Sequence, residues 1–526
     1  MVNCKEMKPL LNNIVLTISS AILLTLSFPK YDIWILAWVG LIPLFFVVSN
    51  NNSKRSFLWC WFSGTLFYSF TTNWITQTMN QYGGMPLWLS FMVLLLLSVY
   101  LGVYTGLFGY LSKYISDNTS IPLPAAAPFV WVSLEFLKAH LLSGFPWASL
   151  GYSQYKFLHI IQIADITGVY GVSFLIVAVN AVLFGIFLLR SEKVLSNRLR
   201  IISISSITFL FVLSLCYGYY RLSKDYDSND NELNIAVIQG NIPQHLKWNR
   251  SFQRKTIDTY KRLTNEAAGH GSDLVVWPET AAPFYFQEYS QYREEVLDIA
   301  ADGNTYLLFG NPSYKLVDDD IKPQMLNSAY LISPYRDIMA RYDKIHLVPF
   351  GEYVPLSNIL FFVEKLASGT GDFSAGRDHI VMELPESKFG VVICYEVIFP
   401  ELVRKFILNG ANFMVTITND AWFGKTSAPY QHFTMAVFRS VENRIYFARA
   451  ANTGISGFIS PKGKILQAGP IFEETVLIQK IFPSNTISFY TKNGDIFTYG
   501  AIFITCLILV IASAKRPRNS SRRGGL

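Results

Sequence analysis

Three side chains at the ends of predicted strands could together carry out acyl transfer through a thiol. Glu279 follows the run DLVVWP, Lys344 follows IMARYD and Cys394 follows KFGVVI. α/β folds place reactive groups at the carboxyl ends of their strands. A carboxylate can act as a general base, a thiol as a nucleophile, and a fixed cation can stabilise an oxyanion. These residue types therefore predict a covalent thioester intermediate on the cysteine.

Cys394 is the residue on which this chemistry depends. The five cysteines lie at 4, 60, 216, 394 and 506, and Cys394 stands alone in the long polar region, which excludes a disulfide within it. A lone cysteine most often packs as an inert buried thiol. Here the amphipathic run FPELVRKFILNG follows it, and the N-terminus of the predicted helix should favour the thiolate. A carboxylate or a lysine in such a place is by itself usually a surface residue, so the argument rests on the combination.

Other site chemistries find little support in the sequence. The seven histidines show no metal-binding spacing, and no CxxC pair is present. Phosphate-binding glycine motifs and a GxSxG elbow are absent as well. We therefore expect no cofactor, no metal and no nucleotide. The net charge of +7 comes largely from basic residues beside apolar runs, so we expect no nucleic-acid partner.

Half of the chain is hydrophobic, and its apolar residues gather in long runs. These runs approach or exceed the roughly 17–25 residues that a membrane-spanning helix needs. They lie at 11–28, 33–49, 56–79, 85–112, 121–142, 160–189, 201–220 and 496–514. The sequence therefore predicts a transmembrane domain of seven helices at 1–220, a polar domain at 221–490, and an eighth helix with a basic tail at 491–526.

The distribution of Lys and Arg predicts the orientation of these helices. Basic residues cluster before the first run, in every second connection and in the tail KRPRNSSRRGGL, whereas the other connections carry only Lys30 and Lys156. Because basic connections stay in the cytoplasm, both termini are expected there and the polar domain outside. Strand and helix patterns in that domain predict an α/β fold.

The motifs around the three residues resemble a known superfamily. Glu279 in WPET, Lys344 in YDKIHLVPFGEYVP and Cys394 in ICYE are similar to the Glu–Lys–Cys triad of the nitrilase, or carbon–nitrogen hydrolase, superfamily. The segments VIQGNIPQHLKW, TNDAWFG and ARAANTGISGFISPKG, set among the apolar runs, resemble the apolipoprotein N-acyltransferase family of bacterial inner membranes over nearly the whole chain. The resemblance implies an extracytoplasmic nitrilase-like α-β-β-α sandwich joined to a polytopic helical membrane domain.

The resemblance also implies a reaction and its partners. Members of the family take an acyl group from a phospholipid, usually phosphatidylethanolamine, hold it as a thioester, and pass it to the amine of a diacylglyceryl-cysteine lipoprotein. Carried over to this sequence, Cys394 is the nucleophile, Glu279 the general base and later acid, and Lys344 stabilises the oxyanion.

Four further residues match positions near the triad of that family. Trp248 matches a tryptophan that contacts substrate, Tyr395 follows the nucleophile, and two acidic residues flank the triad, Glu352 and Glu396. A direct catalytic role for these two carboxylates and a role in orienting or charge-balancing Lys344 are both open.

Two polar segments could control how lipid reaches the site. The segment 143–159 is too polar to span a membrane, and its aromatic residues Phe145, Trp147 and Tyr152 suit an interfacial belt around the lipid route, although an ordinary aromatic-rich external loop is the alternative. The segment 361–376 could form a mobile lid. Glu135 and Lys138, within a predicted span, are expected to pair on one helical face.

Two other function classes are compatible with parts of the sequence. A membrane-tethered amidase or nitrilase would use the same triad with water as acceptor, but eight spans exceed what tethering requires. A transporter or receptor would tolerate loss of Cys394, and the nearly charge-free spans count against it.

Overall fold

The computed structural model describes residues 4–188, 197–224, 232–247, 249–316, 323–353 and 373–514. Contacts divide the chain into two compact units. A helical unit comprises Met1–Asn73, Met92–Tyr219 and Asp495–Leu526, and a second unit comprises Trp74–Phe91 and Tyr220–Gly494. The divisions near 220 and 494 lie close to the predicted boundaries. The assignment of Trp74–Phe91 differs from prediction, because that segment was expected within the membrane domain.

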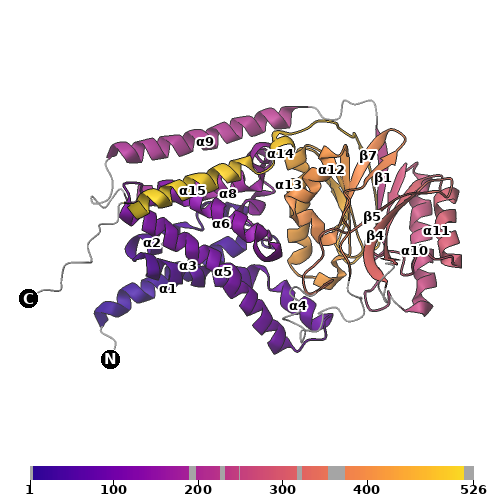
Figure 1. Cartoon of the computed structure of the whole chain (residues 1–526), viewed down its shortest axis with the longest axis horizontal. Helices are drawn as coiled ribbons and strands as arrows, with labels where there is room; N and C mark the ends of the chain where they lie inside the picture. Colours follow the sequence, from indigo (N-terminus) through magenta and orange to yellow (C-terminus); the bar gives the residue numbers. More distant parts are fainter. Residues whose placement is uncertain are drawn as a thin grey trace, which may run out of the picture. The chain divides into compact units, whose positions relative to one another are not determined.

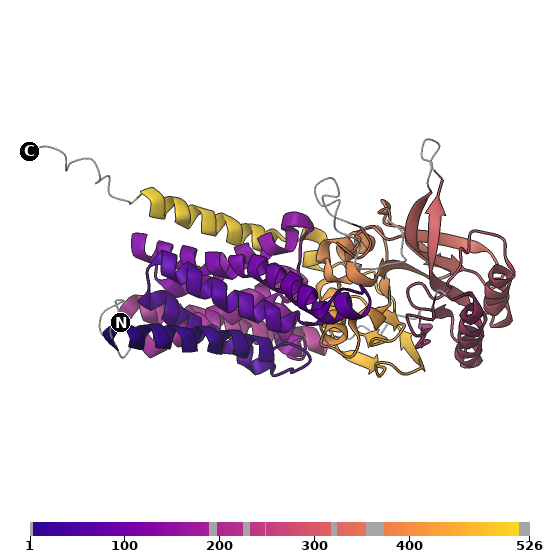
Figure 2. The ribbon, with the colours of Figure 1, turned by 90° about the horizontal axis from the view of Figure 1, so that it is seen from below.

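The helical unit consists of long apolar helices that run side by side in both views (Figure 1, Figure 2). They are α1 (Cys4–Leu26), α2 (Ile42–Asn50), α3 (Ser53–Thr71), α5 (Leu87–Asn118), α6 (Leu123–His140), α8 (Ala164–Leu188), α9 (Asn197–Ser223) and α15 (Ile496–Ala514). Short helical segments lie in the connections between them: η1 (Trp34–Trp38), η2 (Leu141–Ser143), η3 (Leu150–Gln154) and α7 (Leu158–Ile161). Polar bonds tie the bundle together, as where the Ser133 hydroxyl of α6 lies 3.0 Å from the Thr505 hydroxyl of α15.

Six helices in the described part of the chain are long and apolar enough to cross a membrane: α1, α5, α6, α8, α9 and α15. They match six of the eight predicted spans. The run at 33–49 is divided between η1 and α2, and the 9 residues of α2 reach about 14 Å at 1.5 Å per residue, less than half of a hydrocarbon core of roughly 30 Å. The run at 56–79 is also interrupted, because α3 ends at Thr71 and α4 (Trp74–Gln81) belongs to the second unit.

The second unit contains two six-stranded sheets. The first has the order β12-β1-β2-β3-β4-β5 and is built from β1 (Leu233–Gln239), β2 (Leu274–Val276), β3 (Tyr306–Lys315), β4 (Gln324–Ile332), β5 (Ile338–Asp343) and β12 (Thr475–Ile481). The second has the order β11-β10-β9-β8-β7-β6 and is built from β6 (Val381–Leu384), β7 (Ser387–Ile393), β8 (Phe413–Thr418), β9 (Phe447–Ala451), β10 (Gly457–Ile459) and β11 (Ile465–Ala468).

Helices cover the outer face of each sheet. In Figure 1, α10 (Arg250–Gly269) and α11 (Gln291–Asp302) lie outside the first sheet, whereas α12 (Pro400–Leu408) and α13 (Ala428–Asn443) lie outside the second. Buried aromatic and aliphatic side chains, with Trp277 among them, fill the space between the first sheet and its helices. The layer order is therefore α-β-β-α, as the resemblance implied.

The parallel strands at the centre of each sheet explain where the chemistry-bearing residues gather. β2 pairs in parallel with β1 and β3, and β7 and β8 pair in parallel with each other. β2, β7 and β8 are buried throughout or nearly so, which matches their largely apolar and β-branched composition. Glu279 follows β2, Cys394 follows β7 and Asn419 follows β8, so both sheets contribute to one site at their strand ends.

Candidate active site

Glu279 is held by backbone and side-chain donors from both sheets. Its Oε1 accepts from the Asn327 amide at 2.8 Å, and its Oε2 accepts from the backbone N–H of Asn419 at 2.9 Å. The Lys247 ammonium donates to its backbone carbonyl at 3.1 Å. β3 passes so close that a Cβ at Gly310 would lie 2.6 Å from the Glu279 Cα, and glycine is needed there. These bonds fix the carboxylate and leave it lone pairs that can take a proton.

Lys344 follows β5 and is almost completely buried. Its ammonium lies 2.9 Å from Glu352 and 3.8 Å from Glu279, and the side chain is 1% exposed. The amide of Asn327 bridges the two carboxylates, at 2.8 Å from Glu279 and 3.0 Å from Glu352. Burial alone would lower the pKa of the ammonium, but the charges of Glu352 and Glu279 raise it above its ordinary value. Lys344 therefore stays positively charged.

Cys394 sits at the turn between β7 and the short helix η4 (Cys394–Ile398). Its backbone has φ 54°, a left-handed conformation that costs a non-glycine residue about 1–3 kcal/mol. Burial raises the pKa of the thiol, the Glu279 carboxylate raises it further, and Lys344 lowers it by a smaller amount. The thiol is consequently protonated at rest, and its proton must leave as the sulfur attacks.

The expectation that a helix N-terminus would favour the Cys394 thiolate is wrong. The helix α12 begins only at Pro400, after η4, and burial of the sulfur outweighs the neighbouring positive charge. The structure therefore favours proton transfer to a base over a standing thiolate.

Glu396 connects the backbone segments that carry the lysine and the cysteine. Its Oε1 accepts from the Tyr342 hydroxyl at 2.8 Å and from the N–H of Ile345 at 2.7 Å. The same oxygen accepts from the N–H of His346 at 3.0 Å, and Oε2 accepts from the N–H of Ile393 at 2.7 Å. Burial raises the pKa of this carboxyl to about 7. This geometry supports an orienting role for Glu396, and the direct ion pair to Lys344 supports charge balance for Glu352.

The resemblance gave Tyr395 a place directly after the nucleophile and Trp248 a contact with substrate. The Tyr395 ring is half-buried and packs edge-on against Phe399, with centroids 5.2 Å apart, in the chain that follows the nucleophile. Trp248 lies outside the described residues. The predicted lid at 361–376 falls there too, except for its last residues from 373 onward.

Several residues of the site were not singled out from the sequence. Asn419 follows a strand next to that of the cysteine, so the strand-end argument could have found it. Lys247 is buried, and burial lowers the pKa of its ammonium to about 8 despite the charge of Glu279. Asn327 lies within β4, where no local sequence signal marks it.

The aromatic segment at 143–159 does not form the exposed belt that was predicted. Trp147 and Tyr152 are each 1% exposed, and Phe145 is half-buried. An interfacial belt needs aromatic side chains at the surface. Trp147 and Tyr152 are instead buried in the protein, so an exposed aromatic belt is wrong for them, and their part in lipid entry stays a prediction.

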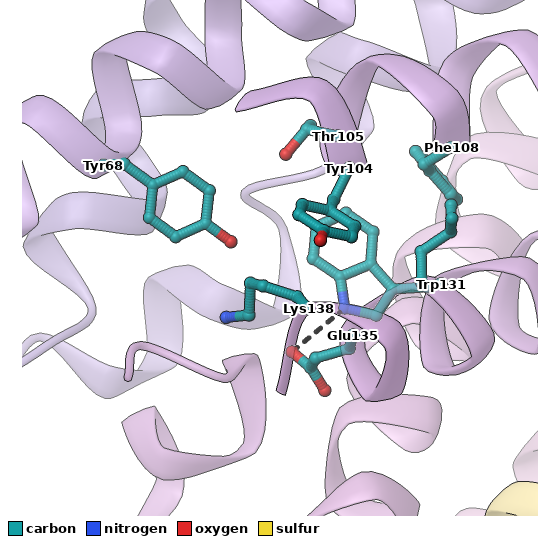
Figure 3. A pocket seen from close by; sticks show the side chains of 8 residues that line it. Tyr68, Tyr104, Thr105, Phe108, Trp131, Glu135 and Lys138 are labelled. Carbon is teal, nitrogen blue, oxygen red and sulfur yellow. Dashed lines mark hydrogen bonds between the residues drawn. The ribbon is translucent and has the colours of Figure 1, made fainter. Parts of the chain in front are cut away.

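Glu135 and Lys138 explain how that segment is held against α6. Figure 3 shows both side chains beside a cavity of about 20 Å³, which Tyr68 and Tyr104 also line. The Glu135 carboxylate accepts from the backbone N–H of Leu150 at 2.7 Å, and the Lys138 ammonium donates to the carbonyl of Trp147 at 2.9 Å. The expected ion pair between the two does not form; each side chain binds the loop instead.

Comparisons with known proteins agree with the two-part organisation. Residues 20–182 match the apolipoprotein N-acyltransferase N-terminal domain, and residues 234–490 match the carbon-nitrogen hydrolase family. An apolipoprotein N-acyltransferase of Geobacter metallireducens is 41% identical over 506 residues, which cover 95% of each chain. The chain belongs to the apolipoprotein N-acyltransferase family. The resemblance inferred from the sequence motifs is thereby confirmed.

Other relatives show how widely the likeness extends. An apolipoprotein N-acyltransferase of Pasteurella multocida is 32% identical, over 98% of each chain. Among solved structures, a nitrilase-superfamily amidase of Nesterenkonia AN1 is 20% identical with a TM-score of 0.38, and the match covers 52% of this chain and 99% of the amidase. Apolipoprotein N-acyltransferase relatives thus match along the full length, the membrane part included.

Proposed function

We propose that this protein transfers a fatty acyl group from a membrane phospholipid to the N-terminal amine of a diacylglyceryl-cysteine lipoprotein. The observation that carries the proposal is a protonated, buried Cys394 thiol beside a fixed carboxylate and a permanently charged Lys344, in a chain whose relatives are apolipoprotein N-acyltransferases. Phosphatidylethanolamine is the proposed donor.

In the first half-reaction, Glu279 takes the thiol proton while the Cys394 sulfur attacks the ester carbonyl of the phospholipid. The negative charge that develops on the carbonyl oxygen faces the Lys344 ammonium. The intermediate then collapses, the carbon–oxygen bond breaks, and Glu279 returns the proton to the departing alcohol of the lysophospholipid. The product is a thioester on Cys394, and the neutral carboxyl group has become a carboxylate again.

In the second half-reaction, the neutral amine of the lipoprotein attacks the thioester carbonyl. Glu279 takes a proton from the attacking nitrogen, Lys344 again faces the oxyanion, and the carbon–sulfur bond breaks. The sulfur recovers its proton from Glu279, and an amide is released. The site is thereby restored, so one triad can serve both steps in turn.

Burial of the site supports transfer rather than hydrolysis. Lys344 is 1% exposed and Cys394 9% exposed, so bulk water has little access to the reacting atoms. A membrane-tethered amidase would need water there as its acceptor. We propose that the catalytic unit faces outside the cytoplasm at the inner membrane and that both termini are cytoplasmic; the asymmetric basic connections support this orientation.

Mass spectrometry of the purified protein tests the proposal. After incubation with phosphatidylethanolamine vesicles, the peptide that contains Cys394 should carry one long-chain acyl group, removable by hydroxylamine and by a diacylglyceryl lipopeptide with a free amine. The Cys394→Ala variant should gain no such group at that peptide. An adduct that water removes as fast as the lipopeptide does would favour the amidase instead.

A further inference from the structure

A buried cluster beneath the nucleophile contains groups that the proposed reaction does not use. His432, on α13, is 0% exposed, and its Nε2 lies 3.1 Å from the backbone carbonyl oxygen of Cys394. Its Nδ1 lies 2.9 Å from the Arg449 guanidinium and 3.1 Å from Asp420. Arg449 is paired with Asp420 at 2.8 Å. The Thr418 hydroxyl completes the cluster by donating to Asp420 at 2.9 Å.

The contacts of His432 determine which ring nitrogen carries the proton. Burial and the charge of Arg449 lower the pKa of the imidazole, so the ring is neutral and has one N–H. A carbonyl oxygen can only accept, so the proton is on Nε2, which donates to Cys394. The unprotonated Nδ1 then accepts from Arg449, which can only donate. Asp420 holds that guanidinium in place, and the ring orientation follows.

The carbonyl that His432 binds belongs to the residue with the left-handed backbone. The peptide between Cys394 and Tyr395 is planar, so a fixed carbonyl also fixes the direction of the Tyr395 N–H, which points the opposite way. At φ 54° the backbone of Cys394 has a competing extended conformation of lower intrinsic energy. A donor on the carbonyl opposes rotation of this peptide and so helps to hold the thiol where it interacts with Glu279 and Lys344.

We propose that His432 is a positioning residue for acyl transfer, which clamps the Cys394 carbonyl through a ring oriented by Arg449 and Asp420. The inference rests on the function proposed above, because its measured quantity is thioester formation on Cys394. It adds a requirement that the triad alone does not contain: a buried donor, the His432 ring, must hold the backbone carbonyl of Cys394.

Two substitutions at 432 separate the donor from the bulk of the side chain. His432→Gln keeps an N–H that can reach the carbonyl, whereas His432→Leu keeps a similar volume and loses the donor. Asn443→Ala is the matched control, since Asn443 is equally buried on the same helix and bonds to Arg439 and Thr491, away from the nucleophile. Thermal unfolding of each purified protein shows whether the variant is folded.

Single-turnover acylation by phosphatidylethanolamine vesicles, followed over a range of lipid concentrations, gives the result. We expect His432→Leu to lower the limiting rate by about 10- to 100-fold with an unchanged half-saturating concentration, because a misplaced nucleophile affects the chemical step. His432→Gln should recover most of that rate, and Asn443→Ala should retain it.

The outcomes distinguish this inference from the proposed function. Equal rates in His432→Leu and wild type overturn the clamp, and so does a loss in His432→Leu that Gln does not restore or that Asn443→Ala shares. Absence of a thioester in the wild-type protein overturns the proposed function itself. A reduced limiting rate confined to His432→Leu supports the clamp.

Discussion

The ammonium of Lys344 lies 2.9 Å from the Glu352 carboxylate and 3.8 Å from that of Glu279. Glu352 is thus the direct ionic partner of the lysine, and the interaction with Glu279 is longer and weaker. This division leaves Glu279 available as a base while the charge of Lys344 is still compensated. It also supports charge balance as the role of Glu352, one of the two roles that the sequence left open.

Substitution of Glu352 by Gln should lower the pKa of Lys344 and leave the proposed base, Glu279, in place. The amide keeps an acceptor for the ammonium but loses the negative charge that raises the pKa of Lys344. We expect acylation to slow by about 10-fold, which is less than the roughly 10²–10³-fold loss on removing an oxyanion donor itself. Stability should fall by about 1–3 kcal/mol, as for a lost bond to a charged group. Single-turnover acylation and urea unfolding measure the two effects. An unchanged acylation rate would show that Glu352 has no influence on the lysine during reaction.

Substitution of Glu279 by Gln should block both half-reactions. The amide keeps one oxygen for the N–H of Asn419 but cannot take a proton from the thiol or the amine. General base catalysis contributes about 10²–10⁴-fold, so acylation and transfer should each fall by that factor. The two steps are measured separately, the second with acyl-enzyme prepared beforehand. Asn327→Asp is a useful comparison, because it changes the contacts of the same carboxylate and retains the base. Wild-type transfer in Glu279→Gln would remove Glu279 from its role.

The fold could be predicted from the sequence wherever the signal is local. Six long apolar runs became apolar helices, and the β-branched runs before Glu279 and Cys394 became buried parallel strands. The assignment of Trp74–Phe91 to the second unit could not be predicted from such local signals. That segment packs on the second unit through contacts such as the Thr78 hydroxyl bond to the Trp422 carbonyl at 2.9 Å, which join residues far apart in the chain.

The sequence pointed to the proposed reactive residues but not to the residues that support them. A strand end marks Glu279 and Cys394 because position along a strand is visible in the sequence. The supports, such as Asn327 and His432, lie inside a strand and a helix and reach the site through tertiary contacts alone. Trp147 shows the opposite error: an aromatic residue in a polar segment suggested a membrane interface, whereas a bond from Lys138 holds its backbone in the interior.

The carboxyl of Glu396 should impose an acid limit on activity. Its pKa is raised by burial to about 7, and as a carboxylate it accepts from donors on both sides of the site. Protonation would place a hydrogen atom on one carboxyl oxygen, so that this oxygen faces an N–H or O–H donor with a donor of its own. The hydrogen bond there would be lost, and the backbone next to Cys394 would become less rigid. We expect the acylation rate to fall as pH drops through about 7, and Glu396→Gln to be slow at every pH without this limb. A wild-type profile that is flat between pH 6 and 8 would contradict this.

The same carboxyl has a consequence for stability that can be measured independently. A raised pKa means that the folded protein still holds the proton between pH 4.5, the ordinary value, and about 7, whereas the unfolded chain has released it. The contribution of Glu396 to stability therefore decreases as pH rises through this window. Thermal unfolding of wild type and Glu396→Gln over pH 5–8 should show the difference between the two proteins changing in that direction, and a constant difference would contradict it.

Lys247 supplies the last prediction, because it is a buried cation whose side chain binds the backbone of the general base. Its ammonium donates to the Glu279 carbonyl at 3.1 Å, and burial lowers its pKa to about 8 from 10.5. Between these pH values the unfolded chain binds a proton that the folded protein has released, so the stability of wild type should rise with pH across the window. Lys247→Met keeps the length of the side chain and removes the titration, and its stability should lack that rise.

Removing the donor also frees the Glu279 carbonyl, so we expect acylation to fall by about 10-fold, as for a displaced catalytic group. Denaturant unfolding from pH 7 to 10 tests the stability prediction, and single-turnover acylation over the same range tests the activity prediction. Lys247→Arg is the control variant that keeps the positive charge. Parallel stability profiles in wild type and Lys247→Met would show that the buried ammonium has an ordinary pKa.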